Sequence, residues 1–269
     1  MTRHRLTYNI CDVLPYINWV YYYHAWQVKD KAGQAGLKAE AMRFLEKCEG
    51  RYEARALVAI GETNSDGDDI VFEGTRIPML RQQETPAAGA PNLSLADFVR
   101  PLSSGKPDRM GVFATTVDSA MVEDFATDDY LHIMAQLLAD RLAEAAAELM
   151  HEQVRKQYWG YAPHESLTID EMHAEKFDGI RPAVGYPSLP DASVNFLLDA
   201  ILGFGDIGIR LTESGAMKPH ASTSGLIMAH PAARYFAIGR IGEDQLRDYA
   251  RRRGLPMQMA RRFLAANIE

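Results

Sequence analysis

The stretch Gly179-Ile-Arg-Pro-Ala-Val-Gly-Tyr-Pro187 is the point from which the rest of the chain is best understood. Each proline fixes its φ angle at about −65° and removes a backbone donor, while Gly185 can adopt angles that are closed to other residues. The pattern therefore predicts a stiff, irregular loop. Arg181 offers a planar fork that suits a carboxylate, and Tyr186 offers a hydroxyl on a rigid ring. We interpret the loop as a preorganised clamp for a small molecule; the alternative is a proline-rich surface loop with a solvated arginine.

The composition around this loop is that of an ordinary globular protein. Hydrophobic residues make up 47% and charged residues 24% of the 269 residues, enough for a full core in one or two domains. The net charge of −7 argues against nucleic acid as the main partner. Cys11 and Cys48 lack metal-type spacing and indicate a reducing compartment. No apolar run approaches the ~20 residues of a membrane helix and no signal peptide begins the chain, so we expect a cytoplasmic protein without membrane contact.

Periodic apolar residues predict one long helix over residues 129–157. Leu131, Met134, Leu138 and Leu142 recur at three- and four-residue steps and so form one apolar stripe. About 28 residues at 1.5 Å each would span roughly 40 Å, which is enough to back an entire sheet.

Shorter elements complete an α+β fold. The aromatic segment Leu14–Trp26 is predicted to cap the core rather than to form a stacking platform. A twisted antiparallel sheet with surrounding helices is expected, within a single domain spanning residues 1–269. Helices are predicted over 38–48, 194–202 and 243–253, and strands over 56–61, 70–72, 109–117 and 207–211, with a hairpin of 225–229 and 234–241 around His230-Pro231.

Two motifs that could carry chemistry fail on their context. Gly203-Phe-Gly-Asp-Ile-Gly208 has the glycine pattern of a dinucleotide site, but it follows a predicted helix and leads into a strand, the reverse of the required order. We interpret it as a glycine-rich turn. His151-Glu152 lacks the second histidine of a zinc-protease helix, and no metal site is predicted.

Several motifs on either side of the loop occur together and in a fixed order. In this order they resemble the S-adenosylmethionine-binding activation domain of cobalamin-dependent methionine synthase, and the resemblance covers nearly the whole chain. The motifs are Leu80–Gln83, Leu95-Ala-Asp-Phe-Val99, Val154-Arg-Lys-x-Tyr-Trp-Gly-Tyr-Ala-Pro163, Arg181-x-x-x-Gly-Tyr-Pro187, Leu211-Thr-Glu-Ser-x-Ala-Met-x-Pro-x-Ala-Ser-x-Ser-Gly225, His230-Pro-x-x-x-Tyr-Phe236 and Asp248-Tyr-Ala-Arg-Arg-x-Gly254.

The resemblance implies a ligand site. Arg181 would bind the ligand carboxylate through a bidentate contact, and Tyr186 would lie near the transferred methyl group as the catalytic residue. Asp97 and Glu144 would face the polar end of the ligand, although a helix cap and a solvated carboxylate are the alternatives for them. The small residues from Ala221 to Gly225 would let the ligand approach the main chain. The implied binding residues are Asp97, Glu144, Arg181, Gly185, Tyr186, Ala221, Ser222, Tyr235 and Phe236.

The implied activity is reductive methylation of a corrinoid. In the family, inert Co(II) cobalamin is reduced by one electron from a flavodoxin- or ferredoxin-type donor, and S-adenosylmethionine then supplies the methyl group. The chain would be the methyltransferase component that carries out this step. Because the resemblance begins almost at Met1 and no Asp-x-His-x-x-Gly cobalamin motif occurs, we expect the cobalamin to be supplied by a separate corrinoid-binding protein, most simply in a split methionine synthase.

One segment departs from the family pattern. After Pro190 the family continues Asp/Glu-His-Thr/Ser-Glu-Lys, whereas this chain has Asp191-Ala-Ser-Val-Asn195, a change expected on the side that faces the corrin. Two alternatives therefore stay open: activation of another corrinoid system such as a demethylase, and a non-catalytic S-adenosylmethionine-binding module.

Arginines are concentrated near the C-terminus. Six of them occur between Arg247 and Arg262, against the single acid Asp248. One hypothesis is that they steer an acidic electron donor or corrinoid protein towards the chain. The alternative is that arginines late in a helix complement its dipole.

Overall fold

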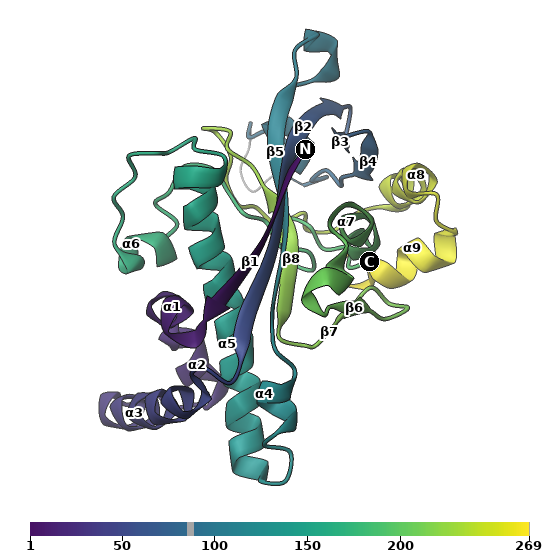
Figure 1. The fold of residues 1–269 in the computed structure, drawn as a ribbon. Helices are drawn as coiled ribbons and strands as arrows, with labels where there is room; N and C mark the ends of the chain where they lie inside the picture. The colour runs from purple at the N-terminus through teal and green to yellow at the C-terminus, as the bar shows by residue number, and fades with distance from the viewer. Residues whose placement is uncertain (85–88, 269) are drawn as a thin grey trace.

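An antiparallel sheet forms the centre of the computed structural model, which describes residues 1–84 and 89–268 (Figure 1). Its main path has the order β4-β3-β2-β5-β8. One edge of β2 is shared, because β1 pairs with residues 53–60 and β3 with residues 63–66. The strands are β1 Thr2–Asn9, β2 Glu53–Asp66, β3 Asp69–Phe72, β4 Thr75–Pro78, β5 Asp108–Val117 and β8 Ser222–Ile227, with β6 Arg210–Leu211 and β7 Met217–Lys218 as a separate pair.

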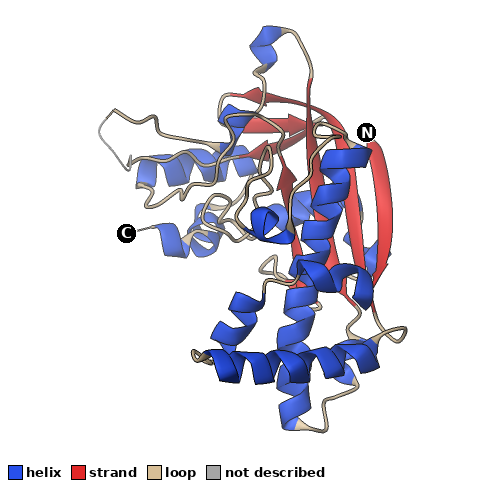
Figure 2. Ribbon diagram, turned by 90° about the vertical axis from the view of Figure 1, so that its left-hand side faces the viewer, coloured by secondary structure: helices blue, strands red, loops and turns tan. Residues whose placement is uncertain are grey.

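Helices cover both faces of this sheet. The group α1, α2, α3 and α5 lies on one side and the group α7, α8 and α9 on the other (Figure 1). The turned view shows the long strands curving past the helices as one layer (Figure 2). The helices are α1 Ile10–Val13, α2 Trp19–Ala25, α3 Lys31–Cys48, α4 Ala120–Glu123, α5 Asp129–Gln153, α6 Ile169–His173, α7 Val194–Leu202, α8 Glu243–Arg253 and α9 Met257–Phe263.

The central strand β2 is buried on both faces, which explains its long apolar run. Successive side chains of a strand point to opposite faces, so Ala56 and Val58 join the core beneath α5, while Leu57 and Ala59 join the core beneath α7. A third, smaller cluster binds α8 and α9 to the body through Leu246 and Leu264. The α+β class with a twisted antiparallel sheet is confirmed.

The long helix begins and ends close to its predicted limits. The side chain of Asp128 accepts a hydrogen bond from the Leu131 N–H and caps the first turn of α5. Met134, Leu138 and Leu142 are fully buried, as their spacing predicts. The α-helix ends at Gln153, and a π turn over Val154–Tyr158 continues it to the limit expected from the sequence.

One strand prediction was right only in part and another was wrong. Of the segment 207–211, Arg210–Leu211 form β6, whereas the residues before them do not, because Phe204–Ile207 forms a 3₁₀ helix and Gly208 has a φ of +87°. Residues 234–241 contain no strand, and the predicted hairpin does not form. The backbone there bonds to loops instead, as the Ile238 N–H donates to the Pro187 carbonyl at 2.9 Å. The strand expected over 225–229 runs over Ser222–Ile227.

Several elements were not predicted from the sequence, or were predicted to be shorter than they are. Strand β1 and the short helices α1 and α9 were not predicted, and α3 begins seven residues earlier than expected, at Lys31. The aromatic segment does cap the core, since Tyr22 is buried and Trp19, Tyr23 and Trp26 pack against the same cluster. None of the helices in the described part of the chain has the length and apolar character needed to cross a bilayer.

Candidate functional site

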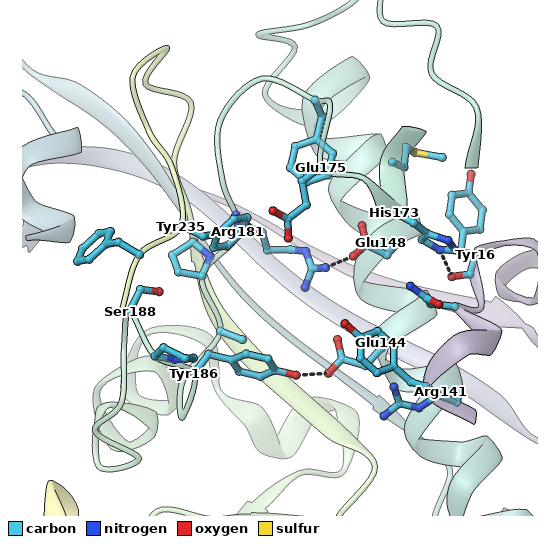
Figure 3. A pocket seen from close by; sticks show the side chains of 18 of the residues that line it. Tyr16, Arg141, Glu144, Glu148, His173, Glu175, Arg181, Tyr186, Ser188 and Tyr235 are labelled. Carbon is cyan, nitrogen blue, oxygen red and sulfur yellow. Dashed lines mark hydrogen bonds and ion pairs between the residues drawn. The ribbon is translucent and has the colours of Figure 1, made fainter. Parts of the chain in front are cut away.

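A cavity of about 670 Å³ lies between the face of α5 and the predicted clamp loop. Figure 3 shows charged and phenolic side chains from both walls pointing into it. Its walls come from four parts of the chain that are distant in sequence: the turn around α2, the middle of α5, residues 172–188 and residues 235–237. The lining residues that the argument uses are Asn18, Tyr21, Arg141, Glu144, Glu148, Met172, His173, Glu175, Phe177, Arg181, Tyr186, Tyr235 and Phe236.

The clamp loop is fixed against the outer edge of β8. The Val184 N–H donates to the Ser224 carbonyl at 2.9 Å, and the Leu226 N–H donates to the Pro182 carbonyl at 3.0 Å. Gly225 makes this approach possible, because a Cβ built there would lie 2.1 Å from the Pro182 oxygen. The loop is irregular, as predicted, it is bonded to β8, and Gly185 turns its tip with a φ of +89°.

Arg181 carries a buried charge at the centre of the cavity wall. Its residue is 8% exposed, and its guanidinium forms an ion pair with Glu148 of α5 and lies 5.4 Å from the Phe113 ring centre. Its backbone N–H donates to the Tyr235 hydroxyl at 2.9 Å. Burial alone would lower the pKa of Arg181, but the nearby Glu148 carboxylate, the Tyr235 hydroxyl and the Glu144 carboxylate raise it. The guanidinium is therefore held ionised.

Tyr186 and Glu144 face each other across the cavity mouth (Figure 3). The Tyr186 hydroxyl donates to Glu144 Oε1 at 3.3 Å. The Glu144 carboxylate, together with burial, raises the pKa of Tyr186 to about 12, so the phenol stays neutral at physiological pH. Arg141, Glu144 and Glu148 are spaced three and four residues apart and present one polar face of α5 to the cavity.

The rest of the cavity wall comes from segments that were not predicted from the sequence to belong to the site. Asn18 caps α2. The Arg141 guanidinium lies over the Tyr21 ring, 5.6 Å from the ring centre. His173 Nε2 lies 3.0 Å from the Tyr16 carbonyl oxygen. Glu175 points towards Arg181, and its pKa is raised by burial and by Glu148. Glu148 was not predicted either, but its i+4 spacing from Glu144 places both carboxylates on one face of α5 and could have indicated it.

The structure brings together five of the predicted binding residues and leaves four outside the cavity lining. Glu144, Arg181, Tyr186, Tyr235 and Phe236 line the cavity, while Gly185, Asp97, Ala221 and Ser222 do not. Gly185 acts as the turn of the clamp loop. Ala221 lies immediately before β8, and the Ser222 hydroxyl is bonded to the Pro219 carbonyl at 2.8 Å. Further along β8, Ser224 and Leu226 hold the clamp loop.

Asp97 serves the structure in another part of the molecule. Its carboxylate pairs with both terminal nitrogens of Arg81, at 2.7 and 2.8 Å, and accepts the Ser94 N–H at 2.9 Å. This closes a capping box at the start of the 3₁₀ helix Leu95–Phe98. The capping alternative considered for Asp97 from the sequence is the one that the structure shows.

The segment that departs from the family pattern is mostly internal. Asp191, Ser193 and Asn195 are all buried, and Asp191 accepts hydrogen bonds from the Ser193 hydroxyl at 2.8 Å and the Tyr249 hydroxyl at 2.7 Å. Asp191 and Ser193 tie the start of α7 to α8, and the Asn195 amide donates to the Gly215 carbonyl at 2.8 Å. These side chains therefore do not form the partner-facing surface that we expected. Gly203 and Gly208, both with positive φ, flank a turn between α7 and β6, which confirms the interpretation of that motif as a turn.

The fold and the cavity together define an α+β domain whose cavity is lined by acidic, basic and phenolic side chains. Over residues 9–254 the sequence matches the family model described as the vitamin B12 dependent methionine synthase, activation domain. The chain belongs to this family. It is also similar to a solved structure of the MetH reactivation domain bound to AdoHcy, with 37% identity and a TM-score of 0.94 over 100% of this chain and 90% of that one. Within residues 1–84 and 89–268, no group of three or more His, Cys, Asp or Glu side chains is arranged to hold a metal ion.

Proposed function

We propose that the cavity binds S-adenosylmethionine and that the chain transfers its methyl group to a corrinoid carried outside this domain. The observation that carries the proposal is the buried Arg181–Glu148 pair on a family fold whose solved relative holds AdoHcy. Arg181 offers the fork for the ligand carboxylate. Nε of Arg181 and Oε2 of Glu148 are both buried without a hydrogen-bond partner among the described residues, so each has hydrogen-bonding capacity that the described residues leave unused.

The charge of the cavity fits the ligand as a whole. S-adenosylmethionine has a carboxylate, an ammonium and a sulfonium, and therefore carries a net positive charge. The cavity presents the acids Glu144, Glu148 and Glu175 against the cations Arg141 and Arg181. Acidic groups close to a cationic ligand stabilise it most where water is excluded. We assign the sulfonium to the mouth, beside Glu144 and the neutral phenol of Tyr186.

The chain contributes binding and orientation to the methyl transfer. The corrinoid, when reduced by one electron, supplies the cobalt nucleophile that takes the methyl group. Tyr186, which is 52% exposed, and Glu144 would present the methyl group towards the outside of the cavity, and Arg181 would anchor the opposite end of the ligand. The main contribution that a protein can make to this transfer is to hold the methyl group and the cobalt close together and in line. Cys11 and Cys48 are free thiols, which supports placing this reaction in the reducing cytoplasm.

The binding step can be tested by calorimetry on the purified chain in the presence of a chelator. S-adenosylmethionine should bind without metal, and Arg181→Ala should weaken binding by about 2–4 kcal/mol, because a buried acidic cluster loses its counter-charge. Arg51→Ala is the control, since Arg51 forms an exposed ion pair with Asp124 far along the chain. Equal binding by wild type and Arg181→Ala, or no binding by either, would contradict the proposal.

The transfer step needs a separate assay. The chain, a corrinoid protein and an electron donor of flavodoxin or ferredoxin type are mixed, and methylcobalamin formation is followed by absorbance. Methylation that requires all three, together with S-adenosylmethionine, supports the activator role. Tight ligand binding without methyl transfer to any corrinoid protein tried would leave a binding module as the better description.

A further inference from the structure

A second buried arginine lies behind the cavity wall and does not touch the cavity. Arg155 is 0% exposed and sits in the π turn that follows α5. Its Nε and Nη2 donate to the two carboxylate oxygens of Glu165 at 2.8 and 2.7 Å. Its carbonyl accepts the Ala162 N–H at 2.9 Å. The residue therefore holds the start of the excursion that leads from the π turn to the clamp loop.

The same guanidinium also holds the end of that excursion. It lies 4.5 Å from the ring centre of Phe177, and the ring of His151, one turn earlier on α5, meets Phe177 edge-on at 4.9 Å. Phe177 is buried and lines the cavity. Glu165 and Phe177 are twelve residues apart in sequence, yet both are in contact with one side chain.

Between these two contacts lie most of the cavity residues that the excursion supplies. Met172, His173 and Glu175 belong to α6 and to the turn after it, where Glu175 has a φ of +55°. Helix α6 has only five residues, so it is too short to be stable alone. Besides Arg155, this stretch contacts the body through His151, whose ring meets Phe177 and whose Nε2 lies 3.3 Å from the Tyr161 hydroxyl, and through the contact of His173 Nε2 with the Tyr16 carbonyl.

We propose that Arg155 is a positioning residue which, through Glu165 and Phe177, braces residues 159–178 so that Met172, His173 and Glu175 are held in place around the ligand. A buried ion pair contributes little to stability compared with apolar residues of the same size. Here Nη1 of Arg155 and Nδ1 of His151 are also buried without a hydrogen-bond partner among the described residues. Such an arrangement is better explained by the geometry that it fixes than by stability. That the braced ligand is S-adenosylmethionine rests on the proposed function.

The test is a double-mutant cycle of Arg155→Met, Glu165→Met and the double variant. The double variant removes both buried charges together and should fold, with a melting temperature close to that of wild type. Its affinity for S-adenosylmethionine should fall by about tenfold, the factor expected when one or two freed side chains must be ordered on binding. The dissociation constant of the ligand should therefore change when the Arg155–Glu165 pair is removed. A pair with a purely structural role would leave this constant unchanged.

Amide hydrogen exchange on the ligand-free proteins gives a readout that does not depend on the ligand. In the double variant, residues 169–177 should exchange faster, while β2 and β5 should be unchanged. Arg252→Met/Asp69→Asn is the control, because this ion pair is nearly buried but lies on the side of the sheet opposite α5 (Figure 1). It should change the melting temperature and leave the ligand affinity intact.

The outcomes separate the two proposals. Absence of binding by wild type would remove the proposed function, and the exchange experiment would still decide whether Arg155 braces the segment. Unchanged exchange in the double variant, or wild-type affinity in a double variant whose parent binds, would overturn the brace.

Discussion

Arg181 keeps its charge in a buried position because its neighbours compensate for the loss of water. The ion pair with Glu148 and the proximity of Glu144 outweigh the effect of burial and raise the pKa of the guanidinium. The cation is therefore present before any ligand arrives. A ligand carboxylate meets a charge whose desolvation is already complete, which reduces the energetic cost of binding.

For His151, by contrast, burial and the neighbouring charges both disfavour the protonated form, and this predicts how stability depends on pH. Burial, followed by the charges of Arg155 and Arg181, holds the pKa of His151 well below its ordinary value of 6.5. Below pH 6.5 the unfolded chain then binds one more proton than the folded chain, so stability falls as the pH falls. His151→Gln should flatten this dependence by up to about 1.4 kcal/mol per pH unit between pH 6.5 and 5.

Urea unfolding at a series of pH values measures this slope. His164→Gln is the control, because His164 is exposed. A slope that is the same in wild type and His151→Gln would mean that His151 is protonated in the folded protein as well.

The sequence predicted the centre of the site better than its rim. Arg181 and Tyr186 could be selected because two prolines and a glycine make their loop stiff, and Glu144 because it matches a family position implied to face the polar end of the ligand. Glu175 and Asn18 could not be predicted from local patterns. They reach the cavity only because the excursion after α5 and the turn before α2 fold back over the same helix.

The clamp loop and β8 form one unit whose spacing is set by a single glycine. Gly225→Ala would place a methyl group 2.1 Å from the Pro182 oxygen and 2.8 Å from the Ala183 Cα, and backbone atoms cannot yield as a flexible side chain can. We expect a loss of about 1–3 kcal/mol in the free energy of unfolding, and a weaker affinity for the ligand because Arg181 shifts with the loop.

Gly205→Ala provides the comparison for this substitution. No atom lies within 4 Å of a Cβ built at Gly205, and its φ is not in the left-handed region. Both variants can be measured by urea unfolding and calorimetry. If Gly225→Ala is as stable as Gly205→Ala, the loop is free to move away from β8 and is not rigid.

Elements with a strong period were predictable, and those fixed by long-range contacts were not. Helices α5, α7 and α8 were found within a few residues because their apolar stripes and caps are local signals. Residues 234–241 are apolar enough to suggest a strand. Their partners, however, are the Gln82 side chain, which donates to the Ala237 carbonyl, and the Pro187 carbonyl, and neither partner is local in sequence.

At the scale of the whole molecule, only some of the six arginines near the C-terminus are exposed on the surface. Arg253 is bonded to the Ser193 hydroxyl at 2.8 Å, and its side chain is 6% exposed. Arg252 is bonded to Asp69, Asp248 and the Met79 carbonyl. These two residues attach α8 to the sheet and to α7. Arg247, Arg251, Arg261 and Arg262 remain exposed on an otherwise acidic protein.

This division sharpens the hypothesis that the arginines steer an acidic electron donor. Long-range attraction acts on the rate of encounter and is screened within about 8 Å at physiological salt. Reversing two exposed charges with Arg247→Glu/Arg262→Glu should slow corrinoid activation several-fold at low salt and much less at high salt. The affinity for S-adenosylmethionine and the melting temperature should not change, because neither residue lines the cavity.

Arg252→Glu is the contrasting variant, since it places an acid beside Asp69 and Asp248 in a nearly buried position. Its melting temperature should fall, and its activity should follow the loss of folded protein at every salt concentration. Stopped-flow reduction at several ionic strengths separates the two behaviours. A rate loss in Arg247→Glu/Arg262→Glu that ignores ionic strength would leave the exposed arginines without a steering role, and the dipole of α8 would then be sufficient to explain those that lie in its last turn.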